Sequence, residues 1–416
     1  MNRREFLKSA LTLAALSPFA KLYAKEGADG NKISEIADGV QVTRRRYKNT
    51  SQTLPLIGYG LMRMPRITPD KPEIDYEIGK KLIDRAMKAG LNYFDTAYPY
   101  HSGLSEKFVG DVITANYPRE SFYLTSKMPH HVAKTEEDLP KIFNEQLSRC
   151  KTDYFDFYLM HNMNDDSWPD AKRLHMYEFL LKMKQEGKIR RLGFSFHSTP
   201  ELLQEIVNAY PNGWDLAQIQ LNYFDWEMYK SKEQYEILTK AGIPIIVMEP
   251  LRGGNLATLN PEATKILKEA RPNSSNAEWA FRYVASLPNV LCVLSGMTYT
   301  EHLEDNIATF APFSPLTDNE RKVLDNALVA YRKSMAIPCT ACQYCMPCPF
   351  GVQIPNLFSY YNQYKVSGNK WHLSMTYNQM GKGNASSCVG CGLCKTKCPQ
   401  HLDIPNLLKE VAKAAS

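Results

Sequence analysis

Asn92-Tyr93-Phe94-Asp95-Thr96-Ala97 is a short apolar segment that ends in an acid and runs on into a loop. The same pattern returns at residues 122–127, where Phe-Tyr-Leu-Thr-Ser precedes Lys127, and at residues 156–161, where Asp-Phe-Tyr-Leu-Met precedes His161. Aromatic and β-branched residues in runs of this length favour β-strands. We therefore expect a series of short buried strands, each closed by a polar residue at its carboxyl end.

The flanking sequence extends this pattern to eight candidate strands separated by amphipathic stretches. The strands are Leu56–Gly60, Asn92–Asp95, Phe122–Ser126, Phe155–His161, Leu192–Phe196, Leu216–Leu221, Ile243–Met248 and Val290–Ser295. Helical spacing of apolar residues is found in stretches such as 76–88, 139–150, 177–186 and 201–209. Gly90, Gly187 and Gly242 each follow a helical stretch, as expected of residues that end helices.

Strands that alternate with helices predict an α/β protein whose parallel sheet closes into a (β/α)8 TIM barrel. An open, doubly wound sheet is the structural alternative, but no G-x-G-x-x-G follows the first strand. Active sites of TIM barrels are built at the carboxyl ends of the strands. Polar residues at those ends are therefore the first candidates for chemistry.

Four residues meet this condition: Asp95, Tyr100, Lys127 and His161. Three of them close predicted strands, and Tyr100 lies five residues after Asp95 in the following loop. An ammonium beside a phenol favours the phenolate, so we expect Lys127 to lower the pKa of Tyr100 and help it release a proton. Asp95 would keep Lys127 charged, and His161 would donate a hydrogen bond to a substrate oxygen.

These four residues, with Gly103-Leu104-Ser105-Glu106 in the loop, resemble the aldo-keto reductase family over roughly residues 52–310. The resemblance implies that the four are the catalytic tetrad of that family. It also implies that the barrel interconverts a carbonyl and an alcohol. By the same resemblance, Ser195, Gln218 and Asn222 would hold the carboxamide of a nicotinamide, since hydroxyl and amide side chains suit a neutral amide.

The segment after the last strand would bind the rest of the nucleotide, through Gly296 and Asn306. Two positions depart from the family pattern. Where members often present an aromatic ring to the nicotinamide, this chain has Met248, and where many NADPH-using members carry a Lys and an Arg, it has Gly296 and His302. Lost cations weaken phosphate recognition. We therefore expect NAD(P) without a choice between NADH and NADPH, and a flavin or an inactive pocket are the alternatives.

Eight of the ten cysteines lie between residues 339 and 398. Residues 339–349 give C-x2-C-x2-C-x2-C-P, and residues 388–399 give C-x2-C-x2-C-x3-C-P, the run of bacterial two-cluster ferredoxins. In such a run three thiolates bind one cluster and the fourth binds the other. The crossed rule assigns one 4Fe-4S cluster to Cys339, Cys342, Cys345 and Cys398, and the second to Cys348, Cys388, Cys391 and Cys394.

The chain repeats itself after each cysteine run, because residues 352–357 read Val-Gln-Ile-Pro-Asn-Leu and residues 402–407 read Leu-Asp-Ile-Pro-Asn-Leu. This repeat is expected of a pseudo-symmetric unit, and it predicts a small α-rich ferredoxin-like domain with two clusters. The alternatives are zinc, which usually has a longer loop between its C-x2-C pairs, disulfides, or one cluster with spectator cysteines.

The chain opens with Met1-Asn-Arg3-Arg4-Glu-Phe6-Leu7-Lys8, followed by a short apolar stretch and small residues near Ala20 and Ala24. This start resembles a bacterial twin-arginine signal, which directs export of proteins already folded around their cofactors. We expect a signal peptide at 1–24, an N-terminal extension at 25–50, the barrel at 51–335 and the cluster domain at 336–416. The expected location is the periplasm.

Charge and hydropathy exclude two classes of partner. The 416 residues carry 50 Lys+Arg and 44 Asp+Glu, a formal charge of +6, which is too mild to predict nucleic-acid binding. The run Arg44–Arg46 is interpreted as a solvated strand face. After the N-terminus no run of eighteen apolar residues exists, so we expect no membrane span after signal removal.

Together these features predict an exported oxidoreductase of the iron–sulfur-containing subgroup of aldo-keto reductases. Its barrel would act on a small carbonyl or alcohol, and two clusters would relay electrons to or from an unidentified redox partner. Clusters exchange single electrons whereas a nicotinamide carries a hydride, so a flavin or a partner protein is expected to bridge the two. The alternative is an electron-transfer or scaffold protein whose barrel is not catalytic and whose clusters are carrier or structural elements.

Overall fold

The computed structural model describes residues 39–416, apart from 49, 69–70, 334–335, 341 and 368–369. Asp38–Ser416 form one compact unit. The signal peptide predicted for residues 1–24 and the first part of the predicted extension lie outside the described residues.

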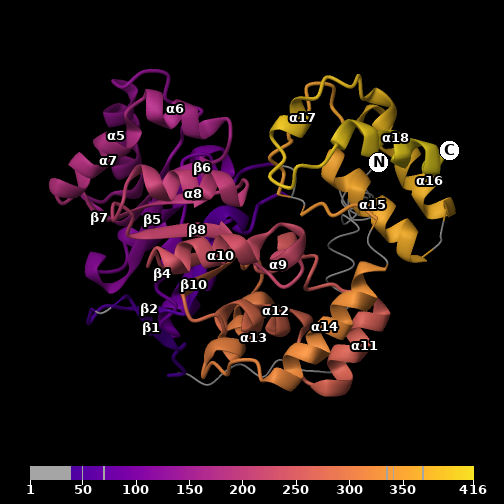
Figure 1. Cartoon of the computed structure of the whole chain (residues 1–416), viewed down its shortest axis with the longest axis horizontal. Coiled ribbons are helices and arrows are strands. Elements are labelled where there is room, and N and C mark those ends of the chain that lie inside the picture. The colour runs from indigo at the N-terminus through magenta and orange to yellow at the C-terminus, as the bar shows by residue number, and fades with distance from the viewer. Residues whose placement is uncertain (1–38, 49, 69–70, 334–335, 341, 368–369) are drawn as a thin grey trace, which may run out of the picture. The chain divides into compact units, whose positions relative to one another are not determined.

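Eight parallel strands close into a barrel in the order β10-β3-β4-β5-β6-β7-β8-β9, with helices around the outside (Figure 1). The strands are β3 (Ile57–Gly60), β4 (Tyr93–Asp95), β5 (Tyr123–Met128), β6 (Phe155–Met163), β7 (Ile189–Phe196), β8 (Leu216–Gln220), β9 (Ile245–Met248) and β10 (Val290–Ser295). Each overlaps a strand predicted from the sequence, so the predicted α/β barrel is confirmed.

Strand stagger brings three of the predicted site residues together. Asp95 is paired with Thr125, and Lys127 lies two residues further along β5. Lys127 is in turn paired with Leu159, and His161 lies two residues further along β6. Side chains alternate between the two faces of a strand, so an offset of two residues from one strand to the next keeps all three side chains on the same face of the sheet. The offset itself follows from the tilt of the strands in a barrel.

A hairpin packs against the core of the barrel. β1 (Arg44–Arg46) pairs antiparallel with β2 (Thr53–Pro55), and Tyr47 and Leu54 join the buried cluster that also contains Phe157 and Leu159. Arg44 and Arg46 are exposed, as expected of a solvated strand face. Arg45 instead is half-buried and donates to the carbonyls of Ala285 at 2.8 Å and Leu287 at 3.2 Å.

Helices cover the barrel through their apolar faces. They are α3 (Tyr76–Lys88), α4 (Leu104–Phe108), α5 (Asp138–Cys150), α6 (Ser167–Arg173), α7 (Met176–Gln185), α8 (Pro200–Ala209), α9 (Asp225–Met228), α10 (Ser231–Lys240), α11 (Pro261–Ala270), α12 (Asn276–Ala285), α13 (Thr300–Phe310) and α14 (Asp318–Arg332). The predicted helices near 76–88, 139–150, 177–186 and 201–209 are confirmed. α14 begins with a capping box in which the side chains of Thr317 and Glu320 each accept a backbone N–H.

The cysteine-rich segment has its own buried core. Its helices are α15 (Ile354–Ser367), α16 (Lys370–Gln379), α17 (Leu393–Thr396) and α18 (Ile404–Ala415). The two copies of the sequence repeat begin α15 and α18, and Ile354 and Ile404 are both buried in that core. This confirms the predicted α-rich domain after the barrel. No helix of the described residues is long and apolar enough to cross a membrane.

Candidate active site and cluster sites

Asp95, Lys127, Tyr100 and His161 meet at the carboxyl end of the barrel. Lys127 Nζ donates to Asp95 Oδ1 at 2.6 Å and to the carbonyl of Thr96 at 2.7 Å, and it makes a longer contact of 3.4 Å with Tyr100 Oη. The rings of Tyr100 and His161 meet edge-on, with centroids 6.0 Å apart. All four residues predicted as the tetrad are therefore brought together.

The loop that carries Tyr100 is held by a local turn. Tyr100 begins the short helix η2 (Tyr100–Gly103), within which His101 and Ser102 have positive φ and Gly103 follows with a φ of +89°. A backbone in this left-handed region favours glycine. The hydroxyls of Thr96 and Ser105 lie 2.7 Å apart and are buried, which ties the loop back to the end of β4.

Glu106 has a structural role beneath the tetrad. Its carboxylate is buried and accepts hydrogen bonds from Ser126 Oγ at 2.7 Å and Gln146 Nε2 at 2.6 Å, and it pairs with Arg149 at 3.2 Å. A buried carboxylate with this many donors is satisfied. The segment Gly103–Glu106, part of the family resemblance, thus fixes the loop without facing the reacting atoms.

The prediction that Lys127 lowers the pKa of Tyr100 is wrong. Burial raises the pKa of Tyr100 well above its ordinary value, and the nearby carboxylates of Asp95 and Glu249 raise it further. The sequence could not show this, because the burial and Glu249 come from tertiary structure. A phenol with a raised pKa is fully protonated at neutral pH, so Tyr100 is suited to donate a proton as charge develops on a substrate oxygen.

His161 is suited to donate a hydrogen bond as a neutral ring. Burial lowers its pKa well below the ordinary value, and the charge of Lys127 lowers it further. A histidine that stays neutral still carries one N–H donor. His161 can therefore orient a carbonyl oxygen without adding a second full positive charge beside Lys127.

The residues predicted to hold a nicotinamide are buried at the ends of β7 and β8, where each has a partner within the protein. Ser195 Oγ accepts the backbone N–H of Asn162 at 2.7 Å, and Gln218 Nε2 donates to Asp95 Oδ2 at 3.1 Å. Asn222 Nδ2 donates to the Asp225 carboxylate at 2.7 Å. Of these contacts, the one made by Gln218 reaches the tetrad directly, and nicotinamide binding by the three residues stays a prediction.

Gly296 directly follows β10, and Asn306 on α13 reaches back to the same strand end, where a cation missed by the sequence analysis is also found. Asn306 Nδ2 donates to Ser295 Oγ at 3.0 Å. The side chain of Arg63 crosses Gly296 so closely that a Cβ there would lie 2.9 Å from Arg63 Cβ. Arg63 Nη2 is buried and has no hydrogen-bond partner within the described part of the chain. The positive side chain of Arg63 therefore approaches the segment after β10, in which the Lys and Arg of many NADPH-using family members are missing.

Glu249 is a second residue that the sequence analysis did not single out. It follows β9 directly and has a φ of +56°. Burial raises the pKa of its carboxyl, partly offset by Arg63, and Oε2 has no hydrogen-bond partner among the described residues. A left-handed non-glycine residue at a strand end is a sign of function, but a single sequence does not reveal backbone conformation.

The cysteine-rich segment contacts the loops that follow β8 and β9. Arg252 Nη2 donates to the carbonyl of Pro338 at 2.7 Å, and Asn255 Nδ2 donates to that of Cys339 at 2.8 Å. Gln400 Nε2 donates to Gln220 Oε1 at 2.9 Å. The first cysteine run and the end of the second are thereby joined to the carboxyl end of the barrel.

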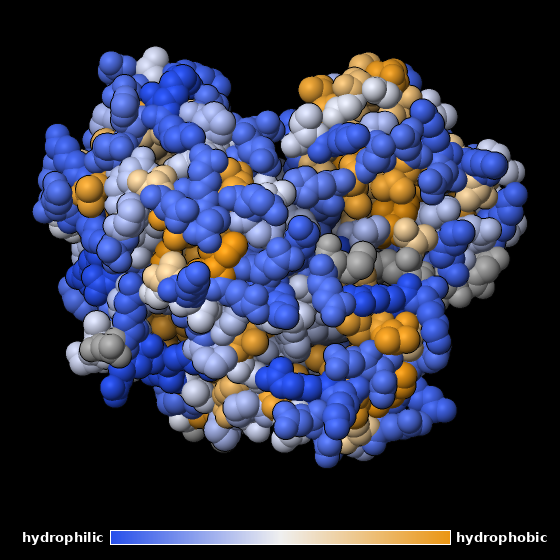
Figure 2. Space-filling view, viewed as in Figure 1, coloured by the Kyte–Doolittle hydropathy of each residue, from blue (hydrophilic) through white to orange (hydrophobic). Residues whose placement is uncertain are grey.

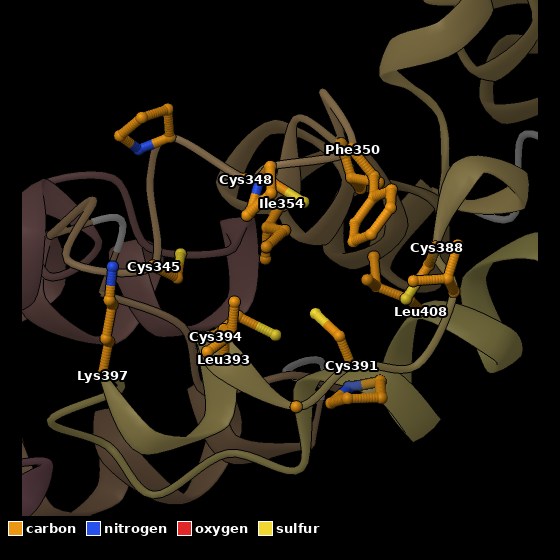
Figure 3. Close-up of a pocket in the computed structure, with 16 residues that line it drawn as sticks. Cys345, Cys348, Phe350, Ile354, Cys388, Cys391, Leu393, Cys394, Lys397 and Leu408 are labelled. Atoms are coloured by element: carbon orange, nitrogen blue, oxygen red, sulfur yellow. The ribbon is translucent and has the colours of Figure 1, made fainter.

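The cysteines line two cavities in the crossed pattern. One cavity is lined by Cys339, Cys342, Cys345 and Cys398 together with Ile354 and Phe358. The other is lined by Cys348, Cys388, Cys391 and Cys394, with Cys345 at its edge, and Figure 3 shows those thiols around the central space. The residues present therefore fit two 4Fe-4S clusters, divided as the crossed rule predicts.

The chemistry of the lining agrees with clusters. None of the ten cysteines forms a disulfide bond in the described part of the chain. Among the described residues, no three His, Cys, Asp or Glu side chains lie close enough to hold a single metal ion. The thiols are instead spread around two spaces with apolar walls, and thiolates are the ligands that bind iron–sulfur clusters.

Comparison with known proteins separates the same two parts of the chain, the barrel and the cysteine-rich domain. Residues 338–403 match the 4Fe-4S dicluster domain. An uncharacterized oxidoreductase of Bacillus subtilis is 26% identical over 274 residues, which are 59% of this chain and 86% of that protein. The L-galactose dehydrogenase of Arabidopsis thaliana is 25% identical over 297 residues, covering 66% of this chain and 90% of that one.

Solved structures support the fold. An aldo-keto reductase from Bacillus halodurans, in its holo form, superposes with a TM-score of 0.56 at 21% identity and covers 69% of this chain and 96% of its own. Residues 56–328, most of the chain, match the aldo/keto reductase family. The chain is therefore an oxidoreductase that belongs to the aldo/keto reductase family and continues into a 4Fe-4S dicluster domain.

Proposed function

We propose that this protein is an exported enzyme that interconverts a small carbonyl compound and its alcohol, with electrons relayed by two 4Fe-4S clusters. One observation carries the proposal. The Asp95–Lys127–Tyr100 chain lies at the carboxyl end of the barrel, and the segment that bears the first set of cluster thiols is hydrogen-bonded to loops at that same end. Proton chemistry and electron chemistry thus share one end of the barrel.

The side chains account for the proton transfers. A carbonyl needs two electrons and two protons to become an alcohol. Tyr100 donates one proton to the developing alkoxide, and Lys127, held by Asp95 at 2.6 Å, stabilises the phenolate left behind. The hydrogen on the carbonyl carbon would come from a nicotinamide as a hydride, which brings both electrons with it, or from solvent as a proton if the clusters supply the two electrons. His161 orients the carbonyl oxygen.

The electrons have two possible sources. A bound nicotinamide supplies a hydride, and each bound cluster exchanges one electron, so two clusters match the two electrons that a carbonyl takes up. Arg63 at the end of β3 supports nucleotide binding, because its buried Nη2 lacks a partner among the described residues and would suit a phosphate. NAD(P) is the cofactor we propose, with a flavin as the alternative.

The second cavity is placed for exchange with a redox partner. Cys391 is exposed, and so are Phe350, Val389 and Leu393, which line the same cavity. Figure 2 shows apolar surface gathered around α17. Electron transfer falls steeply with distance, so a thiol site at the surface favours exchange with a protein that docks there.

The names of relatives guide the choice of substrate probes. Those with at least 25% identity include an L-galactose dehydrogenase, a D-galacturonate reductase and a methylglyoxal reductase. Small polar carbonyl compounds and their alcohols are therefore the substrate class we propose. Export to the periplasm rests on the twin-arginine pattern in residues 1–24, and fractionation of cells that express the full chain would test it.

The proposal is tested on protein purified under anaerobic conditions. We expect iron–sulfur absorption and eight iron atoms per chain, four for each of the two clusters. We also expect turnover of at least one probe with a nicotinamide or a reduced artificial electron donor. Replacing Tyr100 by Phe should lower turnover by about 10²–10⁴-fold while the iron content stays unchanged. Loss of iron in that variant, or unchanged turnover, would contradict the proposed role of Tyr100.

A further inference from the structure

Tyr344 lies in the cysteine-rich segment, between the expected cluster ligands Cys342 and Cys345. Its ring does not stay within that segment. It faces the ring of His197, which directly follows β7, at a centroid distance of 5.9 Å and an interplanar angle of 65°. The cluster loop therefore places an aromatic side chain at the carboxyl end of the barrel.

The neighbour of Tyr344, His197, lies beside the strand that carries His161. The backbone N–H of His197 donates to the carbonyl of Met163 at 3.0 Å, and Met163 is two residues beyond His161 on β6. Tyr344 therefore reaches the end of the barrel at which the tetrad lies. Tyr344 as a residue is half-buried, so it is not part of the fully closed core.

Several buried polar atoms at this end of the barrel have no hydrogen-bond partner within the described residues. They are His197 Nδ1, Glu249 Oε2 and Asn162 Oδ1, on residues that follow or close β7, β9 and β6. Buried polar atoms are nearly always satisfied by protein or by water. Polar atoms left open at the ends of three strands indicate a site for a polar ligand.

The position of Tyr344 is fixed by a buried anchor on the barrel. Arg252 Nε donates to Asp225 Oδ1 at 2.9 Å, and both side chains are at most 2% exposed. Gly253, at a φ of +69°, packs so tightly that a Cβ there would clash with the carbonyl oxygen of Thr340 at 1.6 Å. Such close contact two residues before Cys342 leaves the loop little freedom to carry Tyr344 elsewhere.

We propose that Tyr344 binds the substrate in the barrel, so that the substrate site is complete only while the first cysteine loop is in place. The inference rests on the proposed function and deepens it. The phenol would form a hydrogen bond to a polar group of the substrate, opposite Tyr100 and His161. A cluster-binding loop that also binds substrate would couple occupancy of the barrel to the surroundings of the cluster.

The test compares Tyr344→Phe and Tyr344→Leu with the wild type, on whichever of methylglyoxal and D-galacturonate the wild type reduces. One hydrogen bond is worth about 0.5–1.5 kcal/mol, so we expect KM to rise about two- to tenfold in Tyr344→Phe, with kcat changed less. Tyr344→Leu, which also loses the ring, should raise KM further. Tyr360→Phe, a partly buried tyrosine on α15, is the matched control and should leave KM unchanged.

A spectroscopic readout separates binding from a structural role. In the wild type, adding the same probe should change the electron paramagnetic resonance spectrum of a reduced cluster, and the change should be lost in Tyr344→Phe. An unchanged KM and an unchanged spectral response in Tyr344→Phe would overturn the inference. The proposed function would still stand in that case, because the wild type would turn over the probe. Loss of iron in Tyr344→Phe would also overturn it, since Tyr344 would then serve the loop alone. A wild type inactive on both probes would remove the proposed function and this inference together.

Discussion

Replacing Lys127 by Met tests the buried ion pair that organises the tetrad. Lys127 is 1% exposed and Asp95 is 3% exposed, and their charged atoms lie 2.6 Å apart. Methionine keeps the length and most of the volume of the side chain, so the packing loss is small. Among the described residues, Asp95 would keep one side-chain donor, Gln218 Nε2 at 3.1 Å, and would be left as a buried carboxylate without a cation.

The expected cost is about 3–5 kcal/mol, the usual range for removing one partner of a buried ion pair. Burial already raises the pKa of Asp95 against the opposing effect of Lys127, and the substitution should raise it further. A raised folded-state pKa penalises folding at pH values above it, and the penalty disappears as the pH falls toward the unfolded-state value near 4. The deficit should therefore be largest above neutral pH and shrink on acidification.

The assay is urea denaturation followed by circular dichroism, under anaerobic conditions and on samples matched for iron content. A protein with bound cofactors need not unfold in two states, so the midpoints of matched variants are compared rather than absolute free energies. The double variant Asp95→Asn/Lys127→Met removes both charges, and we expect it to recover about 2–3 kcal/mol relative to Lys127→Met. A double variant no more stable than the single one would refute the idea that the uncompensated charge causes the loss.

Three further predictions follow from the same contacts. Because the pKa of His161 is well below 6.5 and that of Tyr100 is raised, kcat/KM for carbonyl reduction should be flat from about pH 6 to pH 8; an inflection near 6.5 that vanishes in His161→Gln would count against a neutral ring. Arg252→Met breaks the buried pair with Asp225, so it should cost about 3–5 kcal/mol in urea and release the first cluster before the second; simultaneous loss of both at the wild-type rate would show that the anchor is unimportant. Thr317→Ala removes the cap of α14 and should lower stability by about 1 kcal/mol with turnover unchanged; an unaltered urea midpoint would argue against the cap.

The barrel and the tetrad could be predicted because their signals are local. Each strand is a short apolar run, and Asp95, Lys127 and His161 close their runs in register with the strand stagger. The crossed cysteine sets were likewise predicted from spacing, and the structure has two cavities lined in that pattern. Apolar runs, the polar residues that close them and the spacing of the cysteines are all visible within short stretches of sequence.

The remaining features depend on contacts between distant segments. The pKa of Tyr100 moves opposite to the prediction because burial raises it, and the carboxylates of Asp95 and Glu249 raise it further. Arg63 lies over Gly296, which is more than two hundred residues away in sequence, and Tyr344 is one more residue within a cysteine run until that loop folds onto the barrel. The charge of Arg63 and the ring of Tyr344 do not indicate a functional role until distant segments of the chain are folded together.

Electron transfer between the clusters and the barrel is tested most directly by a single-turnover measurement. Protein reduced with dithionite, then freed of reductant and of unbound nucleotide while any tightly bound organic cofactor is retained, is mixed anaerobically with a carbonyl probe that the enzyme turns over. We expect both clusters to be reoxidised as the alcohol forms, with one alcohol for each pair of clusters. Clusters that stay reduced, while NADH or NADPH alone drives alcohol formation, would contradict the proposed relay.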